Sequence, residues 1–142
     1  MNVQVSGARV YAKRVDRVVN LLVVCAGSAI GGGVRYLVAI GMQAARLTGF
    51  FPWATIAVNI VGSFCIMLIA TIAAARAVPA NLQLFLTTGI MGGLTTYSTF
   101  DLETTRFFQD GEPVAALANV GVTLVACFVA GLLGIAAARA IL

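Results

Sequence analysis

The chain has 142 residues, of which 61% are hydrophobic and only 10% are charged, and its mean hydropathy is +1.01. Soluble domains carry about 25% charged residues, so this chain cannot cover a folded surface with polar groups. No solvated basic face with interleaved aromatic residues is available for nucleic acid. The composition therefore predicts an all-α protein embedded in the lipid bilayer, with roughly four membrane-spanning helices.

Four apolar segments follow one another, at about residues 18–41, 53–75, 82–100 and 113–138. The turn-rich stretches LTGFFP, AVPAN and QDGEP separate them. The first segment is too long for the apolar part of a signal peptide, so we expect it to be retained. Residues 1–17 form a basic amino-terminal extension, and residues 18–142 form a single transmembrane domain.

The basic residues predict how the chain is oriented in the membrane. With four spans, the side that holds both chain ends carries Arg9, Lys13, Arg14, Arg17, Arg76 and Arg139. The opposite side carries Arg46 and Arg106. Positive charges favour the cytoplasm, which places both ends there. Without the first seventeen residues the count is two on each side, so only the extension creates the bias.

Small residues recur on single helical faces of the first and fourth segments. GSAIG (27–31) places two glycines four residues apart, and Gly131 and Gly134 lie among alanines. Such faces let helices approach closely in lipid. They serve either packing within one chain or association between chains.

The polar residues argue against catalysis and favour a small anion. The chain has no histidine, and its three cysteines lie in apolar runs without a CxxC spacing. The acidic residues fall outside the predicted spans, at Asp16, Asp101, Glu103, Asp110 and Glu112. No base is therefore paired with a nucleophile, and no deep carboxylate is present to couple protons. Uncharged hydroxyl and amide donors can replace the hydration shell of an anion without trapping it, and aromatic ring edges can face it.

The third segment, LTTGIMGGLTTYSTF (86–100), is unusually rich in glycine and hydroxyl side chains. Gly92 and Gly93 followed by threonines weaken helix propensity, and a broken helix at this depth is tolerated where it lines a cavity. Freed carbonyls there suit a cation. In the alternative interpretation, the hydroxyls bond to their own helix and the glycines only pack.

Four motifs together identify a family. They are GGGVRY (31–36), PWATIAVNIVGSF (52–64), TTGIMGGLTTYSTFDLET (87–104) and GLLG (131–134). From about residue 20 to its carboxyl end, the chain resembles the Fluc/CrcB family of small bacterial fluoride ion channels. The resemblance implies a passive fluoride exporter in the bacterial inner (plasma) membrane. It further implies an antiparallel, dual-topology homodimer with two pores, four helices per subunit, and a third helix broken in mid-span.

The resemblance also implies roles for single residues. The fluoride-pore residues that it implies are Asn59, Phe100, Ser98, Thr99, Thr55 and Thr123, with Arg35 in the vestibule. Backbone carbonyls of Gly92 and Thr95 would hold a structural sodium ion (Na+) at the dimer centre. Two more pore residues depart from the family pattern: the first pore phenylalanine of the family is Tyr97 here, and its fourth-helix tyrosine is Asn119. We hypothesise that Tyr97 still lines the pore and that its hydroxyl replaces part of the missing one.

The basic extension is a third departure, because it favours one orientation, whereas an antiparallel homodimer needs both. An oppositely inserted paralogue is the alternative partner. The alternative function is a small dual-topology, proton-coupled drug or cation exporter, which needs a glutamate within the membrane. A non-transporting assembly subunit is a third interpretation.

Overall fold

The computed structural model describes residues 3–47 and 49–142, with side chains from residue 16 onward. This part of the chain is helical and contains no strand. Its long helices are α1 (Val3–Ala44), α2 (Trp53–Ala75) and α6 (Pro113–Ile141). Three stretches are long and apolar enough to cross a membrane, namely Asp16–Ala44, Trp53–Ala75 and Pro113–Ile141. The predicted all-helical membrane class is thus confirmed, and the second predicted segment coincides with α2.

The predicted third segment forms two helical pieces. The first joins α3 (Ala80–Leu84), the π-helical η1 (Phe85–Met91) and α4 (Gly92–Leu94), and the second is α5 (Tyr97–Gln109). Between them, Thr95 and Thr96 are extended, with ψ of 150° and 116°. Hydropathy falls at residue 101, but α5 continues because Phe100, Thr104 and Phe107 bury one of its faces. The predicted end at residue 100 was therefore nine residues early.

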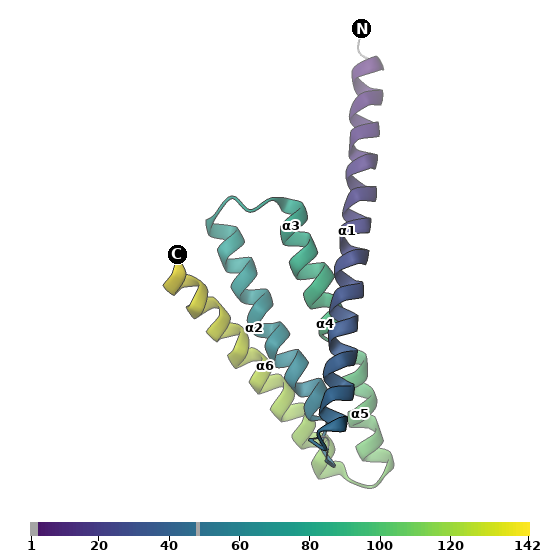
Figure 1. Ribbon diagram of the computed structural model, residues 1–142, viewed down its shortest axis with the longest axis vertical. Coiled ribbons are helices and arrows are strands. Elements are labelled where there is room, and N and C mark those ends of the chain that lie inside the picture. The colour runs from purple at the N-terminus through teal and green to yellow at the C-terminus, as the bar shows by residue number, and fades with distance from the viewer. Residues whose placement is uncertain (1–2, 48) are drawn as a thin grey trace.

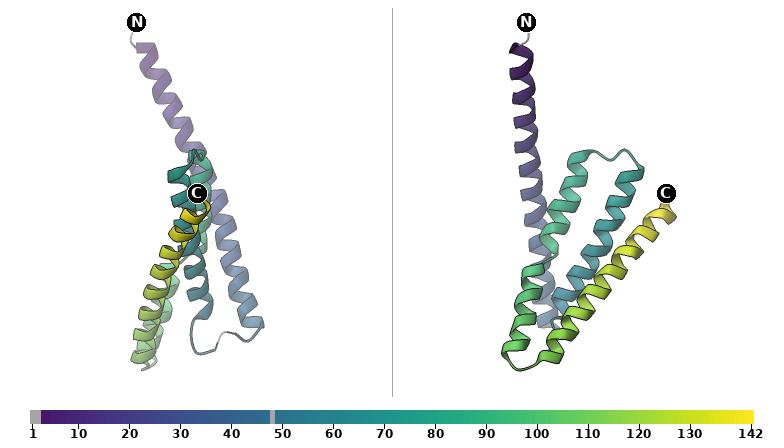
Figure 2. Two further views of the ribbon diagram at one scale, coloured as in Figure 1. Left: turned by 90° about the vertical axis from the view of Figure 1, so that its left-hand side faces the viewer. Right: turned by 180° about the vertical axis from the view of Figure 1, so that it is seen from behind.

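The ribbon diagram shows how these helices lie (Figure 1). Both chain ends and the α2–α3 connection lie toward one end of the molecule, and the other two connections lie at the opposite end. Helix α2 packs on α6, α5 packs on α6, and α1 packs on η1 and α4. Figure 2 shows that the amino-terminal part of α1 projects beyond the other helices. Its backbone enters the first apolar segment without interruption, while the side chains of Arg9, Lys13 and Arg14 lie outside the described residues.

Glycines bring α1 against the third segment. A Cβ atom on Gly27 would lie 2.7 Å from the Cα of Gly89, and one on Gly93 would lie 2.5 Å from the carbonyl oxygen of Ser28. On the other side of the molecule, a Cβ on Gly134 would overlap the carbonyl of Phe64. Both predicted small-residue faces therefore serve packing within the chain, where close backbone approach replaces the hydrophobic drive that lipid removes.

Candidate functional site

Asn59 of α2 holds the break in the third segment open. The backbone N–H of Thr96 donates to Asn59 Oδ1 over 2.8 Å, and Asn59 Nδ2 donates to the Thr96 carbonyl over 3.1 Å. In a continuous helix the same N–H would bond to the carbonyl four residues earlier, that of Gly92. The amide of Asn59 thus replaces a helical bond, and both partners are buried.

Thr96 starts the next helix. Its hydroxyl oxygen accepts from the backbone N–H of Thr99 over 3.2 Å, which is the usual bond of an N-cap threonine. The same hydroxyl donates to Thr99 Oγ1 over 3.0 Å and lies 3.4 Å from Ser98 Oγ. The predicted pore residues Ser98 and Thr99 therefore stand at the first turn of α5, Ser98 exposed and Thr99 half-buried.

The break lies later than predicted. Gly92 is exposed and helical, with φ of −63° and ψ of −35°, and the helix opens only at Thr95 and Thr96. The glycines lead into the break instead of forming it, because Gly89 and Gly93 serve the approach of α1.

The alternative interpretation of this segment is correct for some of its residues. Thr87 and Thr95 donate to carbonyls four residues back in their own helix, over 2.8 and 2.9 Å. The glycines do pack against α1, as that interpretation has it. The threonine at position 96, in contrast, shapes the break.

Of two cavities that adjoin this break, the smaller, ≈ 310 Å³, lies directly against it. Asn59, Thr95, Tyr97, Phe100 and Thr123 line it together with small and apolar residues, and no charged side chain of the described residues does. The rings of Tyr97 and Phe100 have centroids 5.5 Å apart and are tilted by 51°. Phe100 is 7% exposed, whereas Tyr97 is 76% exposed. The structure thus brings together five of the residues that the sequence singled out, around an uncharged space.

Asn119 does not line either cavity. Its side chain has no exposed surface and lies between α5 and α6, where it bonds to Thr104 and Thr123. Asn119 therefore lies beside the wall of the smaller cavity and not in it, and its assignment to a pore stays a prediction.

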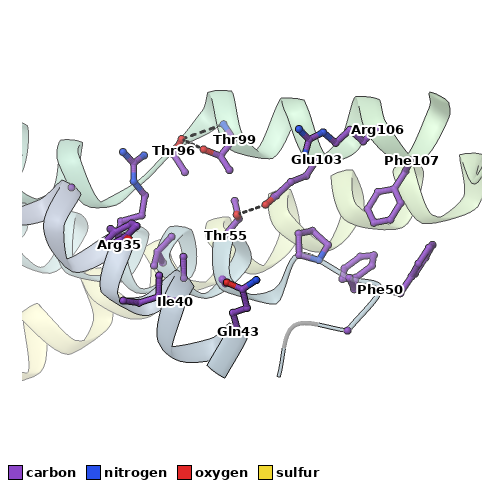
Figure 3. Close-up of a pocket in the computed structure, with 18 of the residues that line it drawn as sticks. Arg35, Ile40, Gln43, Phe50, Thr55, Thr96, Thr99, Glu103, Arg106 and Phe107 are labelled. Carbon is purple, nitrogen blue, oxygen red and sulfur yellow. Dashed lines mark hydrogen bonds between the residues drawn. The ribbon is translucent and has the colours of Figure 1, made fainter. Parts of the chain in front are cut away.

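The larger cavity, ≈ 910 Å³, opens beside α1, the α1–α2 connection and α5 (Figure 3). Arg35, Thr55, Thr99, Glu103 and Arg106 line it. Thr55 donates to Glu103 Oε1 over 2.8 Å, and Glu103 Oε2 is buried without a hydrogen-bond partner among the described residues. Thr96 lines both cavities. The Asn59–Thr96 pair therefore stands where the charged space meets the uncharged one.

The position of Glu103 corrects a prediction. The sequence placed it in the third connection, but α5 reaches Gln109 and carries Glu103 half-buried into the larger cavity. The connection consists only of residues 110–112. The apolar residues on the same face of α5, Phe100 and Phe107, were the signal that the helix continues.

Two further residues of the site, Thr96 and Thr104, were not predicted from the sequence. Thr96 lies in a run of hydroxyl residues, although a threonine directly before a helix is a typical N-cap. Thr104 has a role only because Asn119 lies opposite, and no local pattern announces that pairing.

Comparison with known proteins places this geometry in context. A family model described as "CrcB-like protein, Camphor Resistance (CrcB)" matches residues 22–135. A relative from Pelobacter propionicus, named "Fluoride-specific ion channel FluC", is 42% identical over 119 residues, covering 83% of this chain and 89% of the relative. A relative from Sorangium cellulosum with the same name is 44% identical over 114 residues, covering 80% and 89%. One from a Methylobacterium species, again so named, is 42% identical over 124 residues, covering 87% and 95%.

Proposed function

We propose, from the premise that this chain belongs to the CrcB family, that it is a fluoride-specific ion channel and not an enzyme. It is a multi-pass protein of the bacterial membrane. Fluoride leaves the cell passively through it, and this export protects the cell from fluoride toxicity. The observation that carries this function is the uncharged cavity in which Asn59, Phe100 and Thr123 meet at a broken helix. Its polar groups can bind a small anion, and no charge there retains it.

Asn59 and Phe100 supply different kinds of donor to the ion. The amide of Asn59 has two N–H groups, and the bond to Thr96 uses one of them. The other remains for an anion in the cavity. The ring edge of Phe100 carries the positive end of the aromatic quadrupole, which favours an anion at the edge over one at the face. The hydroxyls of Thr123 and Thr99 are further donors along the path.

The larger cavity is the vestibule of this pore. Arg35 and Arg106 line it together with Glu103 and Asp110, so the formal charge of its lining is balanced. The two guanidinium groups attract an anion there, whereas Asp110 and Glu103, which accepts a hydrogen bond from Thr55, oppose it. The ion would pass from this charged space to the uncharged one beside Thr96.

We further propose that the functional unit is an antiparallel homodimer of four-helix subunits, with an oppositely inserted paralogue as the other possible partner. The third span of each subunit is then the broken segment that ends at Gln109. The smaller cavity supports this proposal, because Tyr97 lines it and is yet 76% exposed, so that one side has no wall. A second subunit would supply that wall.

The structural sodium ion proposed for the dimer centre fits the residues present. Because Asn59 binds the N–H of Thr96, the carbonyl of Gly92 loses its helical partner. Thr95 is extended, so its own carbonyl does not point along the helix as the preceding carbonyls do. Carbonyl oxygens are the ligands that hard cations prefer. Gly92 is exposed, as a site shared between two subunits requires.

Fluoride efflux from liposomes that contain the purified protein tests the function. We expect fluoride to leave without a pH gradient and chloride to be retained. Phe100→Ile should reduce the efflux, whereas the exposed Phe128→Ile on α6 is the matched control and should not. Efflux that requires a proton gradient would favour the exporter instead, and equal passage of chloride would contradict selectivity.

Reporter fusions at the two ends test the dimer arrangement. We expect both orientations in the membrane, because the residues after position 17 are balanced in charge. A single orientation together with full activity when the chain is expressed alone would contradict the antiparallel homodimer. A single orientation and no activity until a paralogue is added would support the paralogue.

A further inference from the structure

A chain of hydrogen bonds joins α6 to α5 behind the smaller cavity. Asn119 Nδ2 donates to Thr104 Oγ1 over 2.8 Å, and Thr104 Oγ1 donates to the carbonyl of Phe100 over 2.7 Å. On the other side of the amide, Thr123 Oγ1 donates to Asn119 Oδ1 over 3.4 Å. Phe100 and Thr123 line the cavity from two different helices, and Asn119 connects them without lining it.

We propose that Asn119 is a positioning residue of the ion pathway, which fixes α5 at the level of Phe100 through Thr104 and orients the hydroxyl of Thr123 on the other helix. The inference rests on the proposed channel function. It assigns Asn119 to the support of the pore wall and not to contact with the ion.

The burial of Asn119 shows why the bonds matter. A fully buried amide is costly unless its groups are paired, and an apolar residue would pack between two helices at no such cost. Here Asn119 uses a donor toward α5 and an acceptor within α6. Thr104 donates its proton to its own helix, which leaves its oxygen lone pairs for Asn119. The pairing therefore sets the position of α5 along α6 at the level of Phe100.

The bond from Thr123 is the longest of the three. Because a hydrogen bond of 3.4 Å lies beyond the usual range for O–H donors, little is lost when this hydroxyl turns from Asn119 to an ion in the cavity. Asn119 thus orients the Thr123 hydroxyl when no ion is present, and the hydroxyl turns toward an ion at little cost in free energy.

Asn119→Leu removes these bonds and keeps a side chain of similar size. We expect fluoride efflux to fall about five- to tenfold, because the loss of one ordinary hydrogen bond would raise the free-energy barrier to permeation by the corresponding amount. We also expect the passage of chloride relative to fluoride to rise. Thr104→Val should act in the same direction, and Thr104→Ser, which keeps the hydroxyl, should retain the wild-type rate. The double variant Asn119→Leu/Thr104→Val should be no slower than the slower single one. Ala118→Leu and Thr105→Val are the matched controls, because both positions are exposed.

The outcomes separate this inference from the function on which it rests. Wild-type protein that passes no fluoride contradicts the channel function itself. Wild-type passage together with unchanged rate and selectivity in Asn119→Leu overturns the positioning role. If Asn119→Leu does not fold in detergent, the Thr104 pair decides, and equal rates in Thr104→Val and Thr104→Ser overturn the role as well.

Discussion

Replacing Asn59 with alanine should close the helix break or destabilise the protein. The substitution removes both bonds to Thr96, whose backbone N–H and carbonyl are buried between the two cavities. Each orphaned buried group costs about 1–3 kcal/mol, so the free energy of unfolding should fall by roughly 2–6 kcal/mol. The lower end applies if the N–H of Thr96 returns to the carbonyl of Gly92 and the two helical pieces join.

The measurement combines unfolding in mixed detergent micelles with fluoride efflux from liposomes. Efflux should be lost in Asn59→Ala, because a rejoined helix moves Tyr97 and Phe100 away from the cavity. Asn59→Asp keeps the acceptor for Thr96 and should lose less stability, yet its carboxylate should repel the anion and abolish efflux as well. Ser63→Ala on α2 is the matched control, since Ser63 lines the same cavity. It should change the unfolding free energy by less than about 0.5 kcal/mol.

One result would refute this reasoning. If Asn59→Ala unfolds within about 0.5 kcal/mol of the wild type and still passes fluoride, the break does not depend on the amide. Asn59 would then act only as a lining residue, or not at all.

Three further predictions concern packing, the ring pair and the cation. Gly31→Ala should cost about 1–3 kcal/mol of unfolding free energy, because its Cβ would overlap the carbonyl of Ile90, whereas Gly33→Ala meets nothing within 4 Å and should be neutral or stabilising; equal effects would contradict the packing of α1. Tyr97→Phe should keep the ring pair with Phe100 and lower fluoride efflux, and unchanged efflux and selectivity would end the hypothesis that its hydroxyl has a role. Replacing sodium by N-methylglucamine in detergent should lower the melting temperature, because carbonyls gathered between subunits would repel one another; a melting temperature independent of sodium would count against the site.

Much of the fold could be predicted from the pattern of apolar residues. The second segment was predicted to the residue because turn residues bound it on both sides. The third was not, because α5 continues beyond the end of the apolar run at residue 100, where only one face of the helix is buried. The side of α5 that carries Glu103 faces a cavity, and no average over neighbouring residues reports that.

Several residues of the candidate site could be predicted from the sequence, but the hydrogen bonds between them could not. Asn59, Tyr97, Phe100 and Thr123 were named in advance, and the structure gathers them around one cavity. Asn119 was named too, but its place between two helices depends on Thr104, fifteen residues away. Such a pairing has no local signature.

By itself, the sequence determined the medium, the helical class and the family, since these follow from composition and from motifs that short-range chemistry imposes. Only the tertiary structure decided where the third helix opens. Glycine and threonine make the whole stretch after Thr87 able to break, but an N–H leaves its helical carbonyl only where another buried acceptor replaces it. That acceptor is Asn59 on a different helix, so the break lies at Thr96 because of packing.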